Sequence, residues 1–198
     1  MKTIRLIIVA VGGQGNLLAS KILGEASLLA GVPVRMSEIH GMAQRGGVVE
    51  SAILFGDAKS TIISEGESDV LLGFEPSETL RALNKCNSGT VVITNLSPIP
   101  PFTAAIGKGN YPDLAKLQNL IRAKVARLIA FDAFSLAKQA GDIMALNMVL
   151  LGSLLQTGIL PLSADHVKEA IRTKTKKAYI ETNIKAFDLG FSAAKALS

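Results

Sequence analysis

A glycine-rich segment near the start of the chain is the first candidate for ligand chemistry. The run Ala-Val-Gly-Gly-Gln-Gly-Asn occupies residues 10–16, between an apolar stretch and a stretch of helical periodicity. Glycines let a backbone turn tightly, and a helix that starts there presents free N–H groups and its positive dipole end to an anion. A tight strand-to-helix turn without a ligand is the alternative. The predicted phosphate-binding residues are Gly12, Gly13, Gln14, Gly15 and Asn16.

The glycine segment matches the known nucleotide-binding fingerprints only in part. The dinucleotide fingerprint G-x-G-x-x-G needs a glycine where this chain has Leu18, and no Gly-Lys-Ser/Thr follows as in a Walker A loop. Glu38, at the end of the second predicted strand, stands about where a ribose-binding acid would lie. A stand-alone nicotinamide- or flavin-binding oxidoreductase therefore stays open as an alternative.

The second candidate is the segment 37–51, SEIHGMAQRGGVVES, which follows a predicted strand. Open parallel sheets place ligand sites at the carboxyl ends of their strands. His40 can donate or accept a proton there, and Arg45, next to flexible glycines, can bind a phosphate or carboxylate with two N–H groups. A hydrogen-bonding surface histidine and an arginine that anchors the loop or a partner chain are the structural alternatives. The expected interface or substrate loop comprises His40, Gly41, Met42, Gln44, Arg45, Gly46 and Gly47.

Hydrophobic periodicity predicts alternating strands and helices over roughly the first two thirds of the chain. Apolar, β-rich runs predict strands at 3–11, 34–38, 48–55, 69–74, 91–94 and 124–131, and a short strand can be drawn at 60–64. Helical spacing and end signals predict helices at 16–30, 76–84 and 113–122, and a helical chain after Asp132. Proline and glycine make 95–112 a long irregular loop.

This order of elements predicts an α/β fold. Strand–helix alternation implies a mostly parallel, Rossmann-like sheet flanked by helices, with a C-terminal helical cap. We expect one domain over residues 1–198, with an α/β core at about 1–132 and a helical tail at about 133–198.

Composition excludes several kinds of site. The 198 residues include one cysteine, Cys86, and two histidines, His40 and His166. They cannot supply a four-cysteine iron–sulfur cluster, a cysteine-rich zinc site or an all-histidine metal site, so no metal site is expected. Trp is absent and the chain has only 2 Tyr and 7 Phe, which argues against single-stranded nucleic acid as a partner.

The net charge of +5 includes a basic cluster near the C-terminus. A solvated helix face is one interpretation of it, and an anion site or a surface for an acidic partner is the other. No nucleic-acid motif accompanies it. The cluster comprises Lys168, Arg172, Lys174, Lys176 and Lys177.

Two apolar stretches imitate membrane or export signals. The run at 6–11 follows basic residues, but it ends in the glycine segment instead of a cleavage site. The stretch between Asp142 and Asp165 has no charge, but Gly158 and Pro161 break it into a helix, a turn and a restart. We expect no membrane segment and a cytoplasmic protein, with 143–164 buried inside the chain or against a partner.

Three segments together resemble one family. AVGGQGNLLASKIL at the start, SEIHGMAQRGG next and LNMVLLG at 146–152 are similar, in this order, to the gamma-type domain of the 2-oxoacid:ferredoxin oxidoreductases. Within that family, residues 40–47 are most similar to the beta subunits of the indolepyruvate enzymes. The resemblance continues through Lys177, Glu181, Asn183 and Gly190. Ala10 replaces the first glycine of the family's turn, which the turn tolerates if the φ of Ala10 stays negative.

The resemblance implies a small subunit of a heteromeric enzyme. In the family, a large partner chain carries thiamine diphosphate and iron–sulfur clusters, ferredoxin accepts the electrons, and coenzyme A takes the acyl group. The reaction implied is oxidative decarboxylation of an aryl pyruvate. This chain would bind no cofactor tightly, and its glycine turn would contact coenzyme A as a shared substrate. His40 and Arg45 would shape the subunit interface or approach coenzyme A. A non-catalytic assembly subunit is the remaining alternative.

Overall fold

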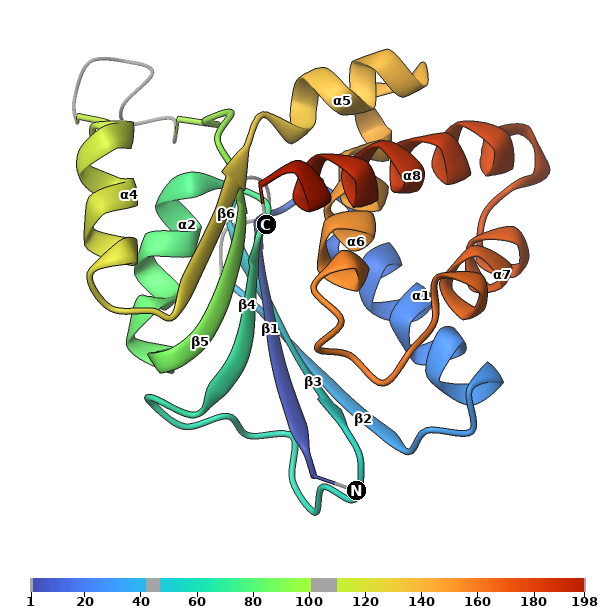
Figure 1. The fold of residues 1–198 in the computed structure, drawn as a ribbon, viewed down its shortest axis with the longest axis horizontal. Coiled ribbons are helices and arrows are strands. Elements are labelled where there is room, and N and C mark those ends of the chain that lie inside the picture. Colours follow the sequence, from blue (N-terminus) through green and yellow to red (C-terminus); the bar gives the residue numbers. More distant parts are fainter. Residues whose placement is uncertain (1, 42–46, 101–109, 198) are drawn as a thin grey trace.

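The computed structural model describes residues 2–41, 47–100 and 110–197, and Figure 1 shows their arrangement. Within these residues, six strands form one sheet in the order β2-β3-β1-β4-β5-β6. The strands are β1 (Ile4–Val11), β2 (Val34–His40), β3 (Val48–Phe55), β4 (Ser68–Gly73), β5 (Cys86–Asn95) and β6 (Arg127–Phe131). β4 pairs with β1 and β5, and β6 with β5, in parallel, whereas β3 is antiparallel to both β1 and β2. The sheet is therefore mixed but mostly parallel, as expected.

Helices cover both faces of the sheet (Figure 1). One face carries α1 (Asn16–Leu29), α5 (Ala133–Ala140), α6 (Leu146–Gln156), α7 (Ala164–Lys174) and α8 (Ile180–Ala196); the other carries α2 (Pro76–Arg81) and α4 (Leu114–Arg122). Short 3-10 turns lie at Ala82–Lys85, Ile143–Ala145 and Lys177–Tyr179. The predicted α/β fold with a C-terminal helical region is confirmed.

Alternation along the strands divides the core into two layers. Leu6 and Ile8 of β1 point into the large apolar layer under α1, α6 and α8, whereas Ile7 and Val9 point into the smaller layer under α4. Successive strand side chains face opposite sides of a sheet, so a strand buried on both faces becomes a continuous apolar run. This is why the first strand was recognisable from sequence.

The uncharged stretch 143–164 contains the buried helix α6. Residues Leu146–Leu155 of α6 are all buried, and α6 packs along α8. Two glycines permit the close approach of α6 and α8. A Cβ at Gly152 would overlap the Phe187 carbonyl, and one at Gly190 would overlap the Val149 carbonyl. Ser153 Oγ donates a hydrogen bond of 2.9 Å to the Gly190 carbonyl oxygen. No described helix is long and apolar enough to cross a membrane.

The structure corrects several predicted boundaries. Residues 60–64 form no strand; they run irregularly, and Ile63 from this segment covers the sheet. β5 begins at Cys86 and is therefore longer than the predicted 91–94. The helix that starts at Pro76 ends at Arg81 as an α-helix and continues only as a 3-10 turn to Lys85. The described parts of the predicted loop, 96–100 and 110–112, are irregular, and 101–109 lie outside the described residues.

Candidate functional site

The glycine segment forms a tight turn between β1 and α1. Gly13 and Gly15 have φ values of 99° and 82°, in the left-handed region that favours glycine, and Gly15 is the N-cap of α1. Ala10 lies inside β1 and has no positive φ, so the turn tolerates the replaced first glycine. No described side chain caps α1, and its first turn holds no acidic residue, so no described side chain occupies its N-terminal N–H groups.

Two side chains of the predicted phosphate turn form hydrogen bonds within the fold. Gln14 Oε1 accepts a hydrogen bond from the Val11 amide at 2.8 Å, and Gln14 Nε2 donates to the Phe74 carbonyl at 3.1 Å. Asn16 is buried; its Nδ2 donates to the Val49 carbonyl at 3.3 Å, and its Oδ1 accepts from Ser51 Oγ at 3.2 Å. A ligand at this turn would therefore meet backbone N–H groups, because both side chains are already bonded.

The two segments singled out from sequence lie next to each other. The Gly12 amide donates to the Gly47 carbonyl at 2.8 Å, and the Gly41 amide donates to the Val48 carbonyl at 2.7 Å. The Gly47 end of the 40–47 segment is thus bonded to the glycine turn, and its Gly41 end is bonded to Val48 of β3. Residues 42–46, with the predicted Met42, Gln44, Arg45 and Gly46, lie outside the described residues. Of His40, the structure describes the backbone, which ends β2 opposite Val49.

A cleft of about 410 Å³ opens at the N-terminus of α1. We call it the lysine cleft; it lies between the start of α1 and the connection from α7 to α8. Its volume falls in the range of small-molecule sites, about 300–1,000 Å³. It brings the glycine turn together with part of the basic cluster, two features far apart in sequence. The residues that define it are Gly15, Asn147, Lys174, Lys176, Tyr179 and Asn183.

The basic cluster is only partly neutralised. Lys168 pairs with Asp188 at 2.6 Å, Arg172 with Glu169 at 3.1 Å, and Lys174 with Glu25 at 2.8 Å. Lys176 and Lys177 are exposed and form no ion pair with any described residue. Lys176 lines the lysine cleft together with Gly15 at the start of α1, and it forms no ion pair with any described residue.

A second, more apolar cleft of about 300 Å³ lies on the other side of the glycine turn. Gly12, Gly13 and Gln14 form one wall, and apolar side chains, most of them exposed, form the rest. Met144 lines both clefts. Such exposed apolar side chains beside a ligand-type turn are typical of binding surfaces. They are Ile99, Phe134, Ile143 and Met144.

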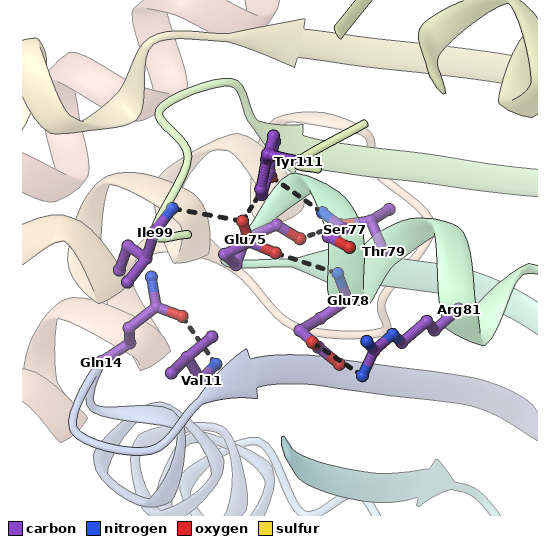
Figure 2. Close-up of polar contacts among 9 residues, drawn as sticks. All are labelled: Val11, Gln14, Glu75, Ser77, Glu78, Thr79, Arg81, Ile99 and Tyr111. Carbon is purple, nitrogen blue, oxygen red and sulfur yellow. Dashed lines mark hydrogen bonds and ion pairs between the residues drawn. The ribbon is translucent and has the colours of Figure 1, made fainter. Parts of the chain in front are cut away.

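A buried carboxylate at the end of β4 organises the neighbouring edge (Figure 2). Glu75 is 1% exposed; its Oε2 accepts from the Glu78 amide at 3.0 Å and its Oε1 from the Ile99 amide at 3.2 Å. The Tyr111 hydroxyl also donates to Glu75 Oε1, and accepts from the Ser77 amide at 3.2 Å. Glu75 thus fastens both described ends of the 96–112 loop to the start of α2.

Electrostatics at this cluster follow from burial. Desolvation raises the pKa of Glu78, and Arg81, 3.4 Å away, opposes that rise. Desolvation and the bond to Glu75 also raise the pKa of Tyr111, which keeps the phenol protonated. Glu78 Oε2 is buried without a hydrogen bond to any described residue. Burial also raises the pKa of the Cys86 thiol, which therefore stays protonated.

Sequence reasoning missed several of these groups. Glu75, Tyr111, Asn147 and Asn183 occur singly in the sequence, without a spacing pattern that marks chemistry. One signal was available for Glu75: an acidic residue directly before a proline at a helix start, which is a capping pattern. No described group of three or more His, Cys, Asp or Glu side chains is placed to hold a metal ion.

The strand order weakens the dinucleotide alternative. In a dinucleotide-binding sheet, the strand with the ribose-binding acid lies next to the first strand. Here the antiparallel β3 separates β2 from β1, so Glu38 is one strand further from the glycine turn. The incomplete glycine fingerprint and the position of Glu38 both argue against dinucleotide binding.

Comparisons with known proteins agree with the fold and the ordered motifs. Residues 5–193 match the family described as pyruvate ferredoxin/flavodoxin oxidoreductase. A Pyrococcus horikoshii protein named indolepyruvate oxidoreductase subunit IorB is 44% identical, over 100% of this chain and 98% of its own length. The predicted resemblance is therefore confirmed.

Two solved structures share the fold. The gamma subunit of a keto/oxoacid ferredoxin oxidoreductase from Geobacter sulfurreducens superposes with a TM-score of 0.72 at 24% identity, covering 98% of this chain and 99% of its own. A 2-oxoglutarate:ferredoxin oxidoreductase from Magnetococcus marinus, with 2-oxoglutarate, coenzyme A and succinyl-CoA bound, gives a TM-score of 0.74 at 22% identity; it covers 100% of this chain and 32% of that one. From the match over 5–193 and the full-length similarity to an indolepyruvate oxidoreductase subunit, this chain belongs to the pyruvate ferredoxin/flavodoxin oxidoreductase family.

Proposed function

We propose that this chain is the small subunit of an enzyme that oxidatively decarboxylates aryl pyruvates, indolepyruvate among them. The observation that carries the proposal is the 44% identity to a named indolepyruvate oxidoreductase subunit along the full length of both chains. In the reaction, the 2-oxo acid loses its carboxyl group as CO₂ and the acyl group forms a thioester with coenzyme A. Two electrons leave to two ferredoxins, and the thiol proton is released.

The division of labour between chains follows from the residues present. This chain has one cysteine, which is buried, and an iron–sulfur cluster needs several thiolates. We therefore assign thiamine diphosphate and the clusters to a large partner chain. Thiamine diphosphate supplies the carbanion chemistry of the decarboxylation.

In this proposal, the chain provides surfaces that contact the large subunit and coenzyme A, and it binds no cofactor tightly. The glycine turn offers backbone N–H groups, and the 40–47 segment is anchored beside it. Exposed apolar side chains around the turn, including Phe134 and Met144, would be covered by the large subunit in a cytoplasmic hetero-oligomer. We assign His40 and Arg45 to the subunit interface or to contact with coenzyme A. Arg45→Ala should then impair assembly or raise the KM for coenzyme A; normal assembly with unchanged kinetics would refute that role.

The experiment that tests the proposal is anaerobic purification of the tagged chain from its native host. We expect a large, cysteine-rich partner to co-purify, and the complex to reduce a dye only with an aryl pyruvate and coenzyme A present. Omitting the small subunit from a reconstituted complex should abolish that activity. A complex whose activity survives this omission would make the chain an assembly factor. A chain that purifies alone and binds NAD or flavin would overturn the proposal.

A further inference from the structure

We propose that the outer edge of β2 binds an extended segment of the large subunit, which joins the sheet as a further strand. The inference rests on the proposed function only for the identity of the partner, because the surface itself is built by this chain. It is separate from the clefts at the glycine turn, since no residue of β2 lines either of them.

The first support is a row of outward-facing backbone groups. β2 is the end strand of the sheet, and β3 is the one described strand that pairs with it (Figure 1). The Gly41 amide donates to the Val48 carbonyl at 2.7 Å, and the Gly56 amide donates to the Pro33 carbonyl at 2.7 Å. In an antiparallel pair, alternate residues turn both backbone groups towards the neighbouring strand, so the odd-numbered residues of β2 face β3. The residues whose N–H and C=O groups face outward are Val34, Met36 and Glu38.

The second support is that β2 lacks the usual protection of an edge strand. Natural edge strands are often short or bulged, or carry lysine or proline, because an open edge pairs with other chains. β2 runs for 7 residues without proline or lysine, and its register with β3 is unbroken. The opposite edge strand, β6, has 5 residues, none of them exposed. Of the two edges of the described sheet, β2 is therefore the one that is open to a further strand.

The third support is apolar exposure on both faces of this edge. Met36 is 40% exposed and Ile39 is 66% exposed. A Cβ at Gly24 would lie 2.9 Å from Met36 Cε, so the Met36 side chain lies over α1. Side chains alternate along a strand, which places Ile39 on the opposite face. Leu28 of α1, 71% exposed, adds apolar surface beside the start of β2. An added strand would cover apolar side chains on both faces as well as pair the backbone.

Charge at the start of β2 indicates the kind of segment that fits. A groove of about 660 Å³ lies there, between the α1–β2 connection and the turn after β3. Arg35 Nε donates to the Ala58 carbonyl at 2.6 Å, which holds the guanidinium at the groove. Lys59, exposed in the same lining, forms no ion pair with any described residue, and Asp57 supplies one carboxylate. Two cations against one carboxylate favour a segment with an acidic residue at this end.

Hydrogen exchange of the purified complex, compared with that of the free chain, tests the site. We expect the outward amides of Met36 and Glu38 to exchange about a hundredfold more slowly in the complex, because the added strand takes up their N–H groups. The amide of Ser37 faces β3 in both states, so its exchange should change much less and serves as the internal control.

A proline variant tests the same edge by affinity. Met36→Pro removes an outward N–H without removing a bond to β3, whereas Met36→Val keeps the N–H and an apolar side chain. We expect Met36→Pro to raise the Kd for the large subunit about tenfold and Met36→Val to change it less than about twofold. Circular dichroism checks folding. Met36→Lys, which keeps the backbone of β2 and places a charge at the edge, replaces the proline variant if that one unfolds.

Charge reversal tests the acidic end of the segment. Lys59→Glu should raise the Kd for the large subunit about threefold, because it repels an acidic residue in the groove. Lys116→Glu makes the same change on an exposed position of α4, which packs beside β6, and should leave the Kd unchanged. Equal effects of the two variants would refute an acidic residue at the groove.

The outcomes separate this inference from the proposed function. An active complex in which the amides of Met36 and Glu38 exchange as fast as in the free chain would refute the site and keep the function. A chain that recovers no large partner would refute the function itself. Sedimentation of the free chain tests a second copy as the occupant. We expect a monomer; a dimer that Met36→Pro dissociates would assign the edge to self-association and overturn the inference.

Discussion

Two polar regions at the same edge of the sheet differ in how their polar groups are paired. Around Glu75, both carboxylate oxygens accept hydrogen bonds, from the Glu78 and Ile99 amides and the Tyr111 hydroxyl, although the neighbouring Glu78 Oε2 is buried without a hydrogen bond to any described residue. In the lysine cleft, the side chains of Asn183 and Lys176 bond to no described residue, and neither is among the buried unsatisfied groups. Hydrogen bonds to a buried carboxylate stabilise a fold, whereas a polar group that faces an open cleft adds little. The comparison teaches that Glu75 holds distant segments of the chain together and that the polar side chains of the lysine cleft do not.

The largest expected effect is in the paired region. Glu75→Leu would leave the amides of Glu78 and Ile99 and the hydroxyl of Tyr111 without their acceptor. We expect the free energy of unfolding to fall by about 4 kcal/mol, because each buried unsatisfied donor costs about 1–3 kcal/mol. Urea denaturation measures it. Asn183→Ala is the matched comparison and should cost less than about 1 kcal/mol, since it breaks no bond. Equal losses would erase the distinction between the regions.

The glycine turn gives the next effect. Gly15→Ala would strain a residue with φ of 82° and place its Cβ 2.5 Å from Asn147 Nδ2. We expect a loss of about 2–3 kcal/mol from backbone strain and displacement of Asn147. Gly31→Ala is the control: Gly31 has φ of 66°, but no atom lies within 4 Å of the position that an alanine Cβ would take. Only the backbone cost of about 1 kcal/mol then remains. Thermal or urea unfolding of both variants tests this; equal losses would show that Gly15 does not need space beside Asn147.

Tyr111→Phe tests the hydroxyl by its pH dependence. The folded pKa of Tyr111 lies above the unfolded value of about 10, so the protonated phenol stabilises the fold below that pH. Its contribution is lost as pH rises above about 10 towards the folded pKa. We expect Tyr111→Phe to cost about 1–2 kcal/mol at pH 7 and the difference from the unmodified chain to shrink as the pH rises above about 10. A difference independent of pH would contradict the buried bond to Glu75.

The smallest effect on stability is expected at Lys176. Its side chain is exposed and unpaired among the described residues, so Lys176→Ala should change the free energy of unfolding by less than about 0.5 kcal/mol. Urea denaturation without ligand measures this, with Lys168→Ala as a comparison that also breaks the 2.6 Å pair to Asp188. A large destabilisation at Lys176 would mean that this lysine is structural.

The sequence predicted features that depend on local pattern. Apolar runs located β1, β3 and β4, because a strand buried on both faces is continuously apolar. The glycine turn was likewise recognisable, because only glycine adopts the φ of Gly13 and Gly15 at low cost. Periodicity could not identify the family; the order of the three motifs along the chain did.

Features that depend on distant contacts were not predictable from one sequence. Nothing local marks β3 as antiparallel, since its direction is set by pairing with β1 and β2. Gln14 and Asn16 resembled ligand residues, yet each is bonded to a distant segment, at Phe74 and at Val49. The segment 60–64 has β-forming residues, yet it pairs with no strand of the sheet, and Ile63 packs into the smaller apolar layer. The lysine cleft joins residues from α1 and α8, a contact that only the fold creates.

The difference in melting temperature between Glu75→Gln and Asn183→Ala tests the contrast between the two regions most directly. We predict that Glu75→Gln lowers the Tm, because it weakens the hydrogen bonds from the Glu78 and Ile99 amides and the Tyr111 hydroxyl, whereas Asn183→Ala leaves the Tm unchanged. Equal losses of Tm in the two variants would contradict the account.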